Sequence, residues 1–165
     1  MGDVEEFMAE RKRMAEEIAR VDALVSRFKK DMPAIEARWD TTERAIQFND
    51  INEEIVSAGL NIYTCSGEAL WAGIFEPAIY DANTLWSDKH RASKIAKVIE
   101  AWASQTALSP IFLVRHGARD LGLVADGKHR LTVSRAIGAA EVPFMVQRTT
   151  DAWVHIAIPS AIRVF

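Results

Sequence analysis

The chain has 165 residues, 49% of them hydrophobic and 26% charged, with a formal net charge of −3 at pH 7. These values are typical of one folded domain, and they argue against a disordered chain and against a stable, sequence-independent binder of DNA. No apolar run approaches the roughly 20 residues of a membrane span. The single cysteine, Cys65, excludes an internal disulfide and a cysteine-based zinc site. Because the N-terminus also lacks an apolar signal core, we expect a cytoplasmic protein.

Residues 4–28 carry apolar side chains at alternating steps of three and four, interrupted only by Arg11. This spacing predicts a long amphipathic helix that ends near Pro33, since proline cannot readily continue a helix. The stripe either packs against the domain's own core or binds a partner as a coiled coil. Its members are Val4, Phe7, Met14, Ile18, Val21, Val25 and Phe28.

A second helix is expected from about Ala34 or Thr41 to Ala58, where Gly59 would end it. Its apolar side would hold Ile46, Phe48, Ile51 and Ile55. The two helices could form a hairpin, so residues 1–58 are predicted to be a helical arm.

Residues 60–165 predict an α+β domain with a small mixed sheet. Two short strands are expected within residues 60–82, which are rich in β-forming residues and are interrupted by glycine and proline. A helix capped by Ser87 or Asp88 should follow, as far as Ala103. The later elements are expected in this order: strand 111–114, turn 115–120, strand 121–125, helix from about Lys128 to Ile137, strand 142–146 and strand 153–159.

Charge is distributed unevenly between the two parts of the chain. Residues 1–70 hold nine Lys and Arg against fifteen Asp and Glu, whereas residues 71–165 hold eleven against eight and all four histidines. An anionic ligand would therefore bind in the second part. Any binding of DNA would be weak and local to that part, because the acidic part repels a phosphate backbone.

An acid, a glycine and three bases stand together where a strand is expected to lead into a helix: Asp126, Gly127, Lys128, His129 and Arg130. The first turn of a helix exposes backbone N–H groups that have no partner inside the helix, and its dipole is positive there. These amides could bind a phosphate, with Gly127 allowing close approach and with Lys128 and Arg130 adding charge. Asp126 could bind Mg²⁺, orient His129 or simply cap the helix.

The stretch DGKHRLTVSRAIGAAEVPFMV resembles the signature of the ParB/sulfiredoxin-like superfamily, and the resemblance covers about residues 71–147. In that signature a strand leads into a D-G-H-H-R or G-x-H-R box, and a short helix ending in glycine and a strand beginning with Val-Pro follow. The resemblance implies that ATP or another nucleoside phosphate binds at the box, with Mg²⁺ as a metal that the site could use. Lys128 stands where sulfiredoxins have their catalytic cysteine, so sulfinic-acid repair by that mechanism is excluded.

Within that superfamily, the box is most similar to those of the free-serine kinase and the nuclease-like branches. The plan of a small domain with added helices resembles the plasmid fertility-inhibition proteins, which include the oncogenic-suppression protein. The resemblance thus implies ATP hydrolysis that could extend to DNA cleavage, in a protein that suppresses conjugative or T-DNA transfer. Its partners could include DNA and a DNA-transfer or secretion-system protein. Two alternatives stay open: a small-molecule kinase, and a non-catalytic interaction protein that acts through its N-terminal helices.

Glu76 is the candidate for a further catalytic acid beside Asp126 and His129, because the first strand of such folds approaches the phosphate site. It could activate water or help hold Mg²⁺, or it could simply face solvent. Glu68 and Asp81 are weaker candidates for the same role. The remaining histidines are expected at solvent-accessible places: His90 on the exposed side of a helix, His116 in a turn and His155 on a strand face.

Overall fold

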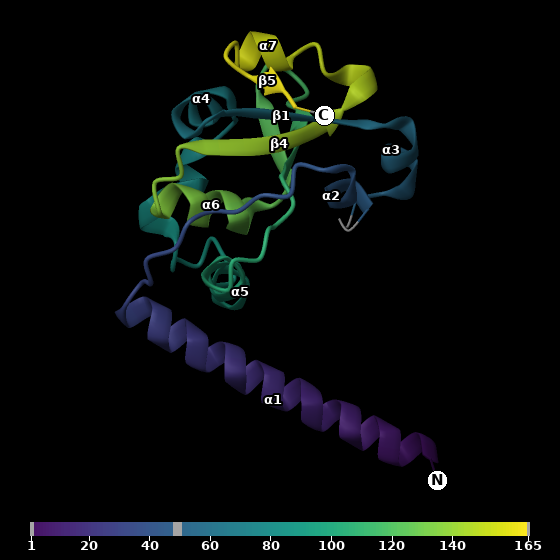
Figure 1. The fold of residues 1–165 in the computed structure, drawn as a ribbon, viewed down its shortest axis with the longest axis vertical. Helices are drawn as coiled ribbons and strands as arrows, with labels where there is room; N and C mark the ends of the chain where they lie inside the picture. The colour runs from purple at the N-terminus through teal and green to yellow at the C-terminus, as the bar shows by residue number, and fades with distance from the viewer. Residues whose placement is uncertain (1, 48–50, 165) are drawn as a thin grey trace.

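The computed structural model describes residues 2–47 and 51–164 and joins one long helix to a mixed α+β domain (Figure 1). The sheet has five strands in the order β3-β2-β4-β1-β5. β2 and β4 run parallel, and the other neighbouring strands run antiparallel. The strands are β1 (Leu60–Ser66), β2 (Ile111–Arg115), β3 (Gly122–Asp126), β4 (Glu141–Gln147) and β5 (Ile162–Arg163). The predicted α+β class is confirmed.

The long N-terminal helix is also confirmed, as α1 (Gly2–Lys30). Acidic residues occupy its first turn and basic residues its last, which is the arrangement that the helix dipole favours. Only its second half packs on the domain, where Val21 and Phe28 are buried against α5 (Ala92–Ala103). The first half extends beyond the domain, as Figure 1 shows. The second half of α1 is therefore packed against the domain, and its first half is exposed to solvent.

The second helix, expected to begin at about Ala34 or Thr41, does not form over residues 34–42, which cross the domain in an extended path. Trp39 packs edge-on against Trp102 at 5.2 Å between ring centroids, and its backbone forms a parallel bridge to Leu108. The indole N–H of Trp102 donates to the carbonyl of Arg38 at 2.9 Å. These tertiary contacts override the local helical preference. Two short helices, α2 (Glu43–Gln47) and α3 (Glu53–Ala58), follow, and Phe48 lies outside the described residues.

Residues 60–82 form one strand rather than two, because β1 leads directly into the helix α4 (Gly67–Gly73). The Ser66 hydroxyl accepts a hydrogen bond from the N–H of Ala69 at 3.1 Å and so caps α4. Two 3₁₀ turns, η1 (Pro77–Tyr80) and η2 (Ala82–Thr84), complete the segment. The next helix, α5, begins after Arg91 and not after Ser87, whose hydroxyl donates instead to the carbonyl of Thr84 at 2.8 Å.

The hairpin of β2 and β3, the helix α6 (Lys128–Ala136) and the strand β4 all form where the sequence predicts them. The predicted last strand is wrong, since residues 154–157 form the short helix α7 (Val154–Ala157) after a 3₁₀ turn, η3 (Arg148–Thr150). Asp151 fixes this segment on β1, because its carboxylate accepts hydrogen bonds from Asn61 at 2.9 Å and Tyr63 at 2.8 Å.

The layers follow one another from α1 to α5, then to α6, then to the sheet (Figure 1). α6 contributes to two cores, since Leu131 packs in the core formed with the sheet and Val133 packs in the core formed with α1 and α5. Partly buried side chains of α3 pack in a third core, with Leu60, Met145 and other sheet residues. α6 is therefore held on two sides, and its first turn has a fixed position. Within the described ranges, no helix has the length and apolar character needed to cross a membrane.

Candidate phosphate-binding site

The predicted box lies at the junction of β3 and α6. Asp126 is the last residue of β3, and Gly127 precedes α6 with a left-handed backbone, φ 92° and ψ 21°. A Cβ atom at residue 127 would lie 2.8 Å from Nη2 of Arg130. Glycine is required here for two reasons, the positive φ and the close guanidinium.

The start of α6 has no side-chain cap. The first hydrogen bond of the helix runs from the N–H of Leu131 to the carbonyl of Gly127, at 2.9 Å. The three preceding amides, of residues 128–130, come too early in the helix to find a carbonyl within it. Asp126 does not fill this place, since no side chain caps α6 and the Asp126 carboxylate lies 3.5 Å from Nη2 of Arg130. The interpretation of Asp126 as a simple cap is therefore wrong.

Two of these residues, Lys128 and His129, border a pocket of about 220 Å³. The pocket brings together four of the predicted residues, Asp126, Gly127, Lys128 and His129, and adds Lys94 from the first turn of α5. Val124 and Ala125 complete its lining. No local signal in the sequence could have identified Lys94, because it reaches the box only through the packing of α5 on α6.

Lys128 and His129 both contact the segment that leads into α5. The Lys128 ammonium donates to the carbonyl of Lys89 at 3.1 Å. The backbone N–H of Arg91 donates to Nε2 of His129 at 3.3 Å, which leaves the ring proton of a neutral His129 on Nδ1. The start of α5 and the start of α6 are thereby held side by side.

Burial, followed by the positive charges nearby, lowers the pKa of His129 to about 4. Those groups are Lys128, His90, Lys94 and Arg91. His129 is therefore neutral at pH 7. The same charges that disfavour its protonation favour a bound anion.

Arg130 does not line the pocket. Its guanidinium turns back toward β2, where Nη2 donates to the carbonyl of Pro110 at 3.3 Å and lies near Asp126. Its Nε is buried with no hydrogen-bond partner among the described residues. The Arg130 guanidinium thus packs against the backbone of Gly127, outside the pocket.

Glu76 is not brought into the pocket. The backbone N–H of Phe75 donates to the carbonyl of Gly122 at 2.8 Å, at the opposite end of β3 from Asp126. Glu76 itself is exposed, with a left-handed backbone at φ 51°. Its charge adds to the effect of burial in raising the pKa of Tyr80. Glu68 is exposed on α4, and Asp81 caps η2 by accepting from the N–H of Asn83.

The expected exposure of His90 is wrong, because His90 precedes α5 and is buried under α6. Its Nε2 lies 3.0 Å from the carbonyl of Ile79 and 3.3 Å from the hydroxyl of Thr132. His116 lies in the predicted turn, half-buried against Phe75. His155 is exposed on α7 instead of on a strand.

The lining of the pocket can contribute to a Mg²⁺ site but cannot complete one. Among residues 2–47 and 51–164, no three His, Cys, Asp or Glu side chains gather as metal ligands. Asp126 supplies a carboxylate to the pocket, and its side chain is 40% exposed. A Mg²⁺ ion fits here only if phosphate oxygens and water supply the other ligands, as is common for this metal.

Comparisons of the chain with protein-family models, with curated proteins and with solved structures found no match.

Proposed function

We propose that this protein binds the phosphate groups of ATP, or of another nucleoside phosphate, at the start of α6. The observation that carries the proposal is the uncapped first turn of α6, which opens into a pocket shared with Lys94 and Lys128. The free backbone amides of Lys128 and His129, the helix dipole and two ammonium groups suit a multiply charged phosphate. The absent side chain of Gly127 leaves room for the Arg130 guanidinium, which brings a further positive charge close to the start of α6.

ATP hydrolysis is the activity that we propose for this site, with DNA cleavage as a possible extension of the same phosphate-ester chemistry. Asp126 is the residue that would hold Mg²⁺ together with the phosphate oxygens, and the metal would neutralise charge on the transferred group. Lys94 and Lys128 would stabilise the same charge. His129 positions the helix more than it moves a proton, because its Nε2 accepts from Arg91 and its low pKa keeps it neutral. Glu76 would require a rearrangement of the chain to take part.

The resemblance of about residues 71–147 to the ParB/sulfiredoxin-like superfamily supports this proposal. It also supports a role in suppressing conjugative or T-DNA transfer, through a DNA-transfer or secretion-system protein. Binding to DNA itself should be weak and should be lost as salt is raised, since basic residues outnumber acidic ones only in residues 71–165.

The experiment compares the affinity of the full chain for ATP with that of Lys94→Ala, Lys128→Ala and Lys97→Ala, by calorimetry. Each of the first two variants removes a charge from the pocket, so we expect each to weaken binding about tenfold or more. Lys97→Ala is the matched control, because Lys97 is exposed on the same helix but lines a depression on the side of α1. Equal affinity in all four proteins would contradict the phosphate site.

Turnover separates binding from chemistry. ATP hydrolysis with and without Mg²⁺ is measured for the wild-type chain and for Asp126→Asn. We expect hydrolysis to depend on Mg²⁺ and to be lost in the variant, while the melting temperature and the affinity for metal-free ATP change little. If the wild-type chain binds ATP but does not hydrolyse it, the proposed phosphate site stands and the proposed ATPase activity is contradicted.

A further inference from the structure

The first half of α1 presents an apolar face that nothing in the described structure covers. Val4, Phe7, Met14 and Ile18 are between 57% and 67% exposed, whereas Val21 and Phe28, farther along the same stripe, are 3% and 5% exposed. One stripe, interrupted only by Arg11, thus has a buried half and an exposed half. Its second half packs on α5, and its first half has the same composition but lacks a partner.

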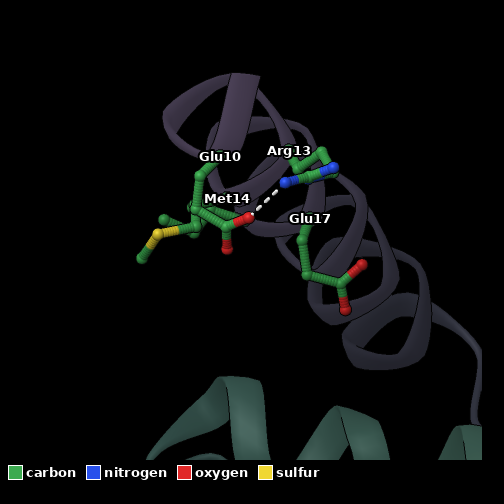
Figure 2. A pocket seen from close by; sticks show the side chains of 5 residues that line it. Glu10, Arg13, Met14 and Glu17 are labelled. Carbon is green, nitrogen blue, oxygen red and sulfur yellow. Dashed lines mark hydrogen bonds and ion pairs between the residues drawn. The ribbon is translucent and has the colours of Figure 1, made fainter. Parts of the chain in front are cut away.

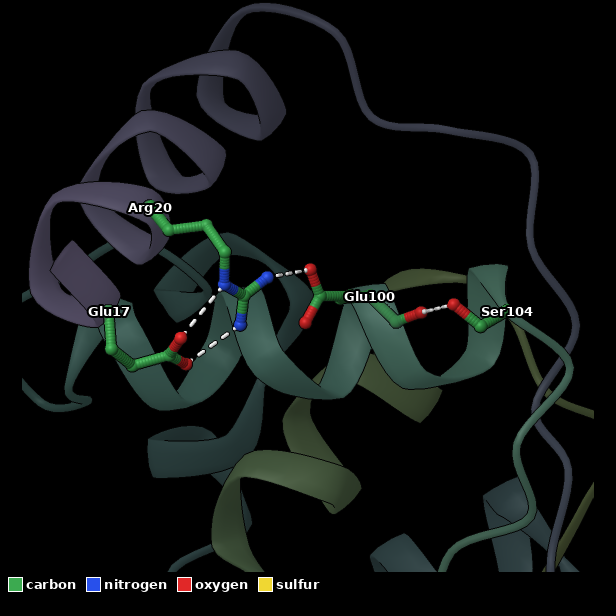
Figure 3. Close-up of polar contacts among 4 residues, drawn as sticks. All are labelled: Glu17, Arg20, Glu100 and Ser104. Atoms are coloured by element: carbon green, nitrogen blue, oxygen red, sulfur yellow. Dashed lines mark hydrogen bonds and ion pairs between the residues drawn. The ribbon is translucent and has the colours of Figure 1, made fainter. Parts of the chain in front are cut away.

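The contacts of Arg20 mark the boundary between the two halves. Figure 3 shows its guanidinium between Glu17 of α1 and Glu100 of α5. Just before this point, a depression of about 260 Å³ lies between Glu17, Ile18 and Val21 of α1 and Ser93 and Lys97 of α5. The apolar stripe therefore continues from the α1–α5 interface onto the free half without a break.

Acidic residues follow one edge of the free stripe. Asp3, Glu10 and Glu17 recur at steps of seven, so they lie in line along the helix, next to Phe7 and Met14. A depression of about 360 Å³ is lined by residues of both the edge and the stripe, and Figure 2 shows Glu10 and Glu17 beside Met14 at its border. Arg13 pairs with Glu10 and Arg20 with Glu17, but such exposed pairs are weak and leave the carboxylates available to a partner.

We propose that residues 3–18 of α1 form a docking surface for an amphipathic helix of another protein, whose apolar face is bordered on one edge by Lys and Arg. The two helices would pack as a coiled coil, with Phe7, Met14 and Ile18 between them. The acidic edge would select the partner by charge. Arg11, which stands in the stripe with its guanidinium 5.9 Å from the centroid of the Phe7 ring, would fix the register against an acidic residue of the partner.

Charge excludes a second copy of this chain as the occupant. In an antiparallel pair of α1 helices, the two acidic edges would face each other. In a parallel pair, Arg11 would face Arg11 of the other copy, and Glu17 would meet Asp22 of the other copy. Neither arrangement forms a favourable ion pair. The same acidic edge would be repelled by an anionic lipid surface.

Two designed peptides of three heptads test the proposal with the full chain. They share one leucine stripe, and the edge that would face Asp3, Glu10 and Glu17 carries Lys in one peptide and Glu in the other. We expect the Lys peptide to bind at least about tenfold more tightly in fluorescence anisotropy, with the difference reduced at high salt. Phe7→Ser should weaken its binding by about tenfold or more. Ile156→Ser, which removes an apolar side chain that is 63% exposed on α7, is the matched control and should bind as the wild type does.

Charge reversal provides the decisive measurement. The double variant Asp3→Lys, Glu10→Lys should prefer the Glu peptide. Equal binding of both peptides, or of neither, would overturn the proposal. So would self-association in sedimentation, or binding to anionic vesicles, if Phe7→Ser abolished it, because the occupant would then be a second copy or a membrane. None of these outcomes depends on ATP binding, so this surface and the phosphate site are tested separately.

Discussion

The backbone N–H of Arg91 donates to Nε2 of His129 at 3.3 Å, and this contact joins the start of α5 to the first turn of α6. The contact requires an unprotonated Nε2. Burial and the surrounding cations keep the imidazole in that form by lowering the pKa of His129 to about 4. The junction of the two helices therefore depends on the charge state of one side chain.

Stability should fall on mild acidification because of His129. In the unfolded chain His129 takes up a proton as the pH falls through about 6.5, whereas in the folded chain it does so only near pH 4. Its contribution to the free energy of unfolding is therefore complete above pH 6.5 and is lost as the pH falls from 6.5 to 4. We expect a loss of ~1–3 kcal/mol over that range, measured by urea unfolding at a series of pH values.

His129→Gln is the control for this measurement, since glutamine offers an acceptor to Arg91 and does not titrate. His90, whose pKa is also lowered by burial, is present in both proteins, so the difference between them isolates His129. An identical dependence on pH in the two proteins would show that His129 titrates normally.

Gly127→Ala should destabilise the fold more than Gly138→Ala. Both glycines have a positive φ, of 92° and 67°, so both substitutions strain the backbone, by about 1 kcal/mol. A Cβ at residue 127 also displaces the Arg130 guanidinium from its place beside Pro110, whereas a Cβ at residue 138 has nothing within 4 Å. The difference in free energy of unfolding should be ~1–2 kcal/mol. If the two variants are equally stable, Arg130 moves aside without cost.

Gly73→Ala should strongly destabilise the fold, because Gly73 is buried at the end of α4. A Cβ there would lie 2.4 Å from Cγ1 of Ile158 and 3.0 Å from the carbonyl oxygen of Ala157, a buried site that cannot accept a methyl group without movement. We expect a loss of ~2 kcal/mol or more in thermal or urea unfolding. Gly117→Ala, where a Cβ meets nothing within 4 Å and φ is not positive, should change stability little. Full stability of Gly73→Ala would mean that Gly73 does not lie this close to Ala157 and Ile158.

The elements that the sequence predicted correctly are those with a strong local signal. α1 follows from the spacing of its apolar stripe, and β2, β3, α6 and β4 follow from short apolar runs separated by glycine. A strand was predicted at residues 153–159 because His155 alternates with apolar neighbours there. The structure buries Trp153, Val154 and Ile158 and exposes His155 and Ile156, a helical pattern that becomes visible only when the faces of α4 and the sheet are known. The path of residues 31–42 likewise depends on Trp102 and Leu108, far along the chain.

The residues of the candidate site also differ in whether the local sequence identifies them. Asp126 to His129 are neighbours in the sequence, so one stretch sufficed to propose them. The place of Lys94 beside them, and the inward turn of Arg130, depend on how α5 and β2 pack against α6. Sequence separation also explains why the place of Glu76 could not be predicted, since nothing local shows that its neighbour Phe75 bonds to Gly122, at the opposite end of β3 from Asp126.

The pairing of β1 with β4 also determines the order in which the chain can fold. Leu60 pairs with Gln147 and Ser66 with Glu141, so the central ladder of the sheet joins two segments that are synthesised far apart in time. Such non-local contacts slow folding, because a long loop must close before they form. A nascent chain can complete α1 at once, but β1 has no neighbour until β4 has left the ribosome. A chain that stops before Glu141 would therefore expose the buried side chains of β1, and proteolysis or aggregation would be its expected fate.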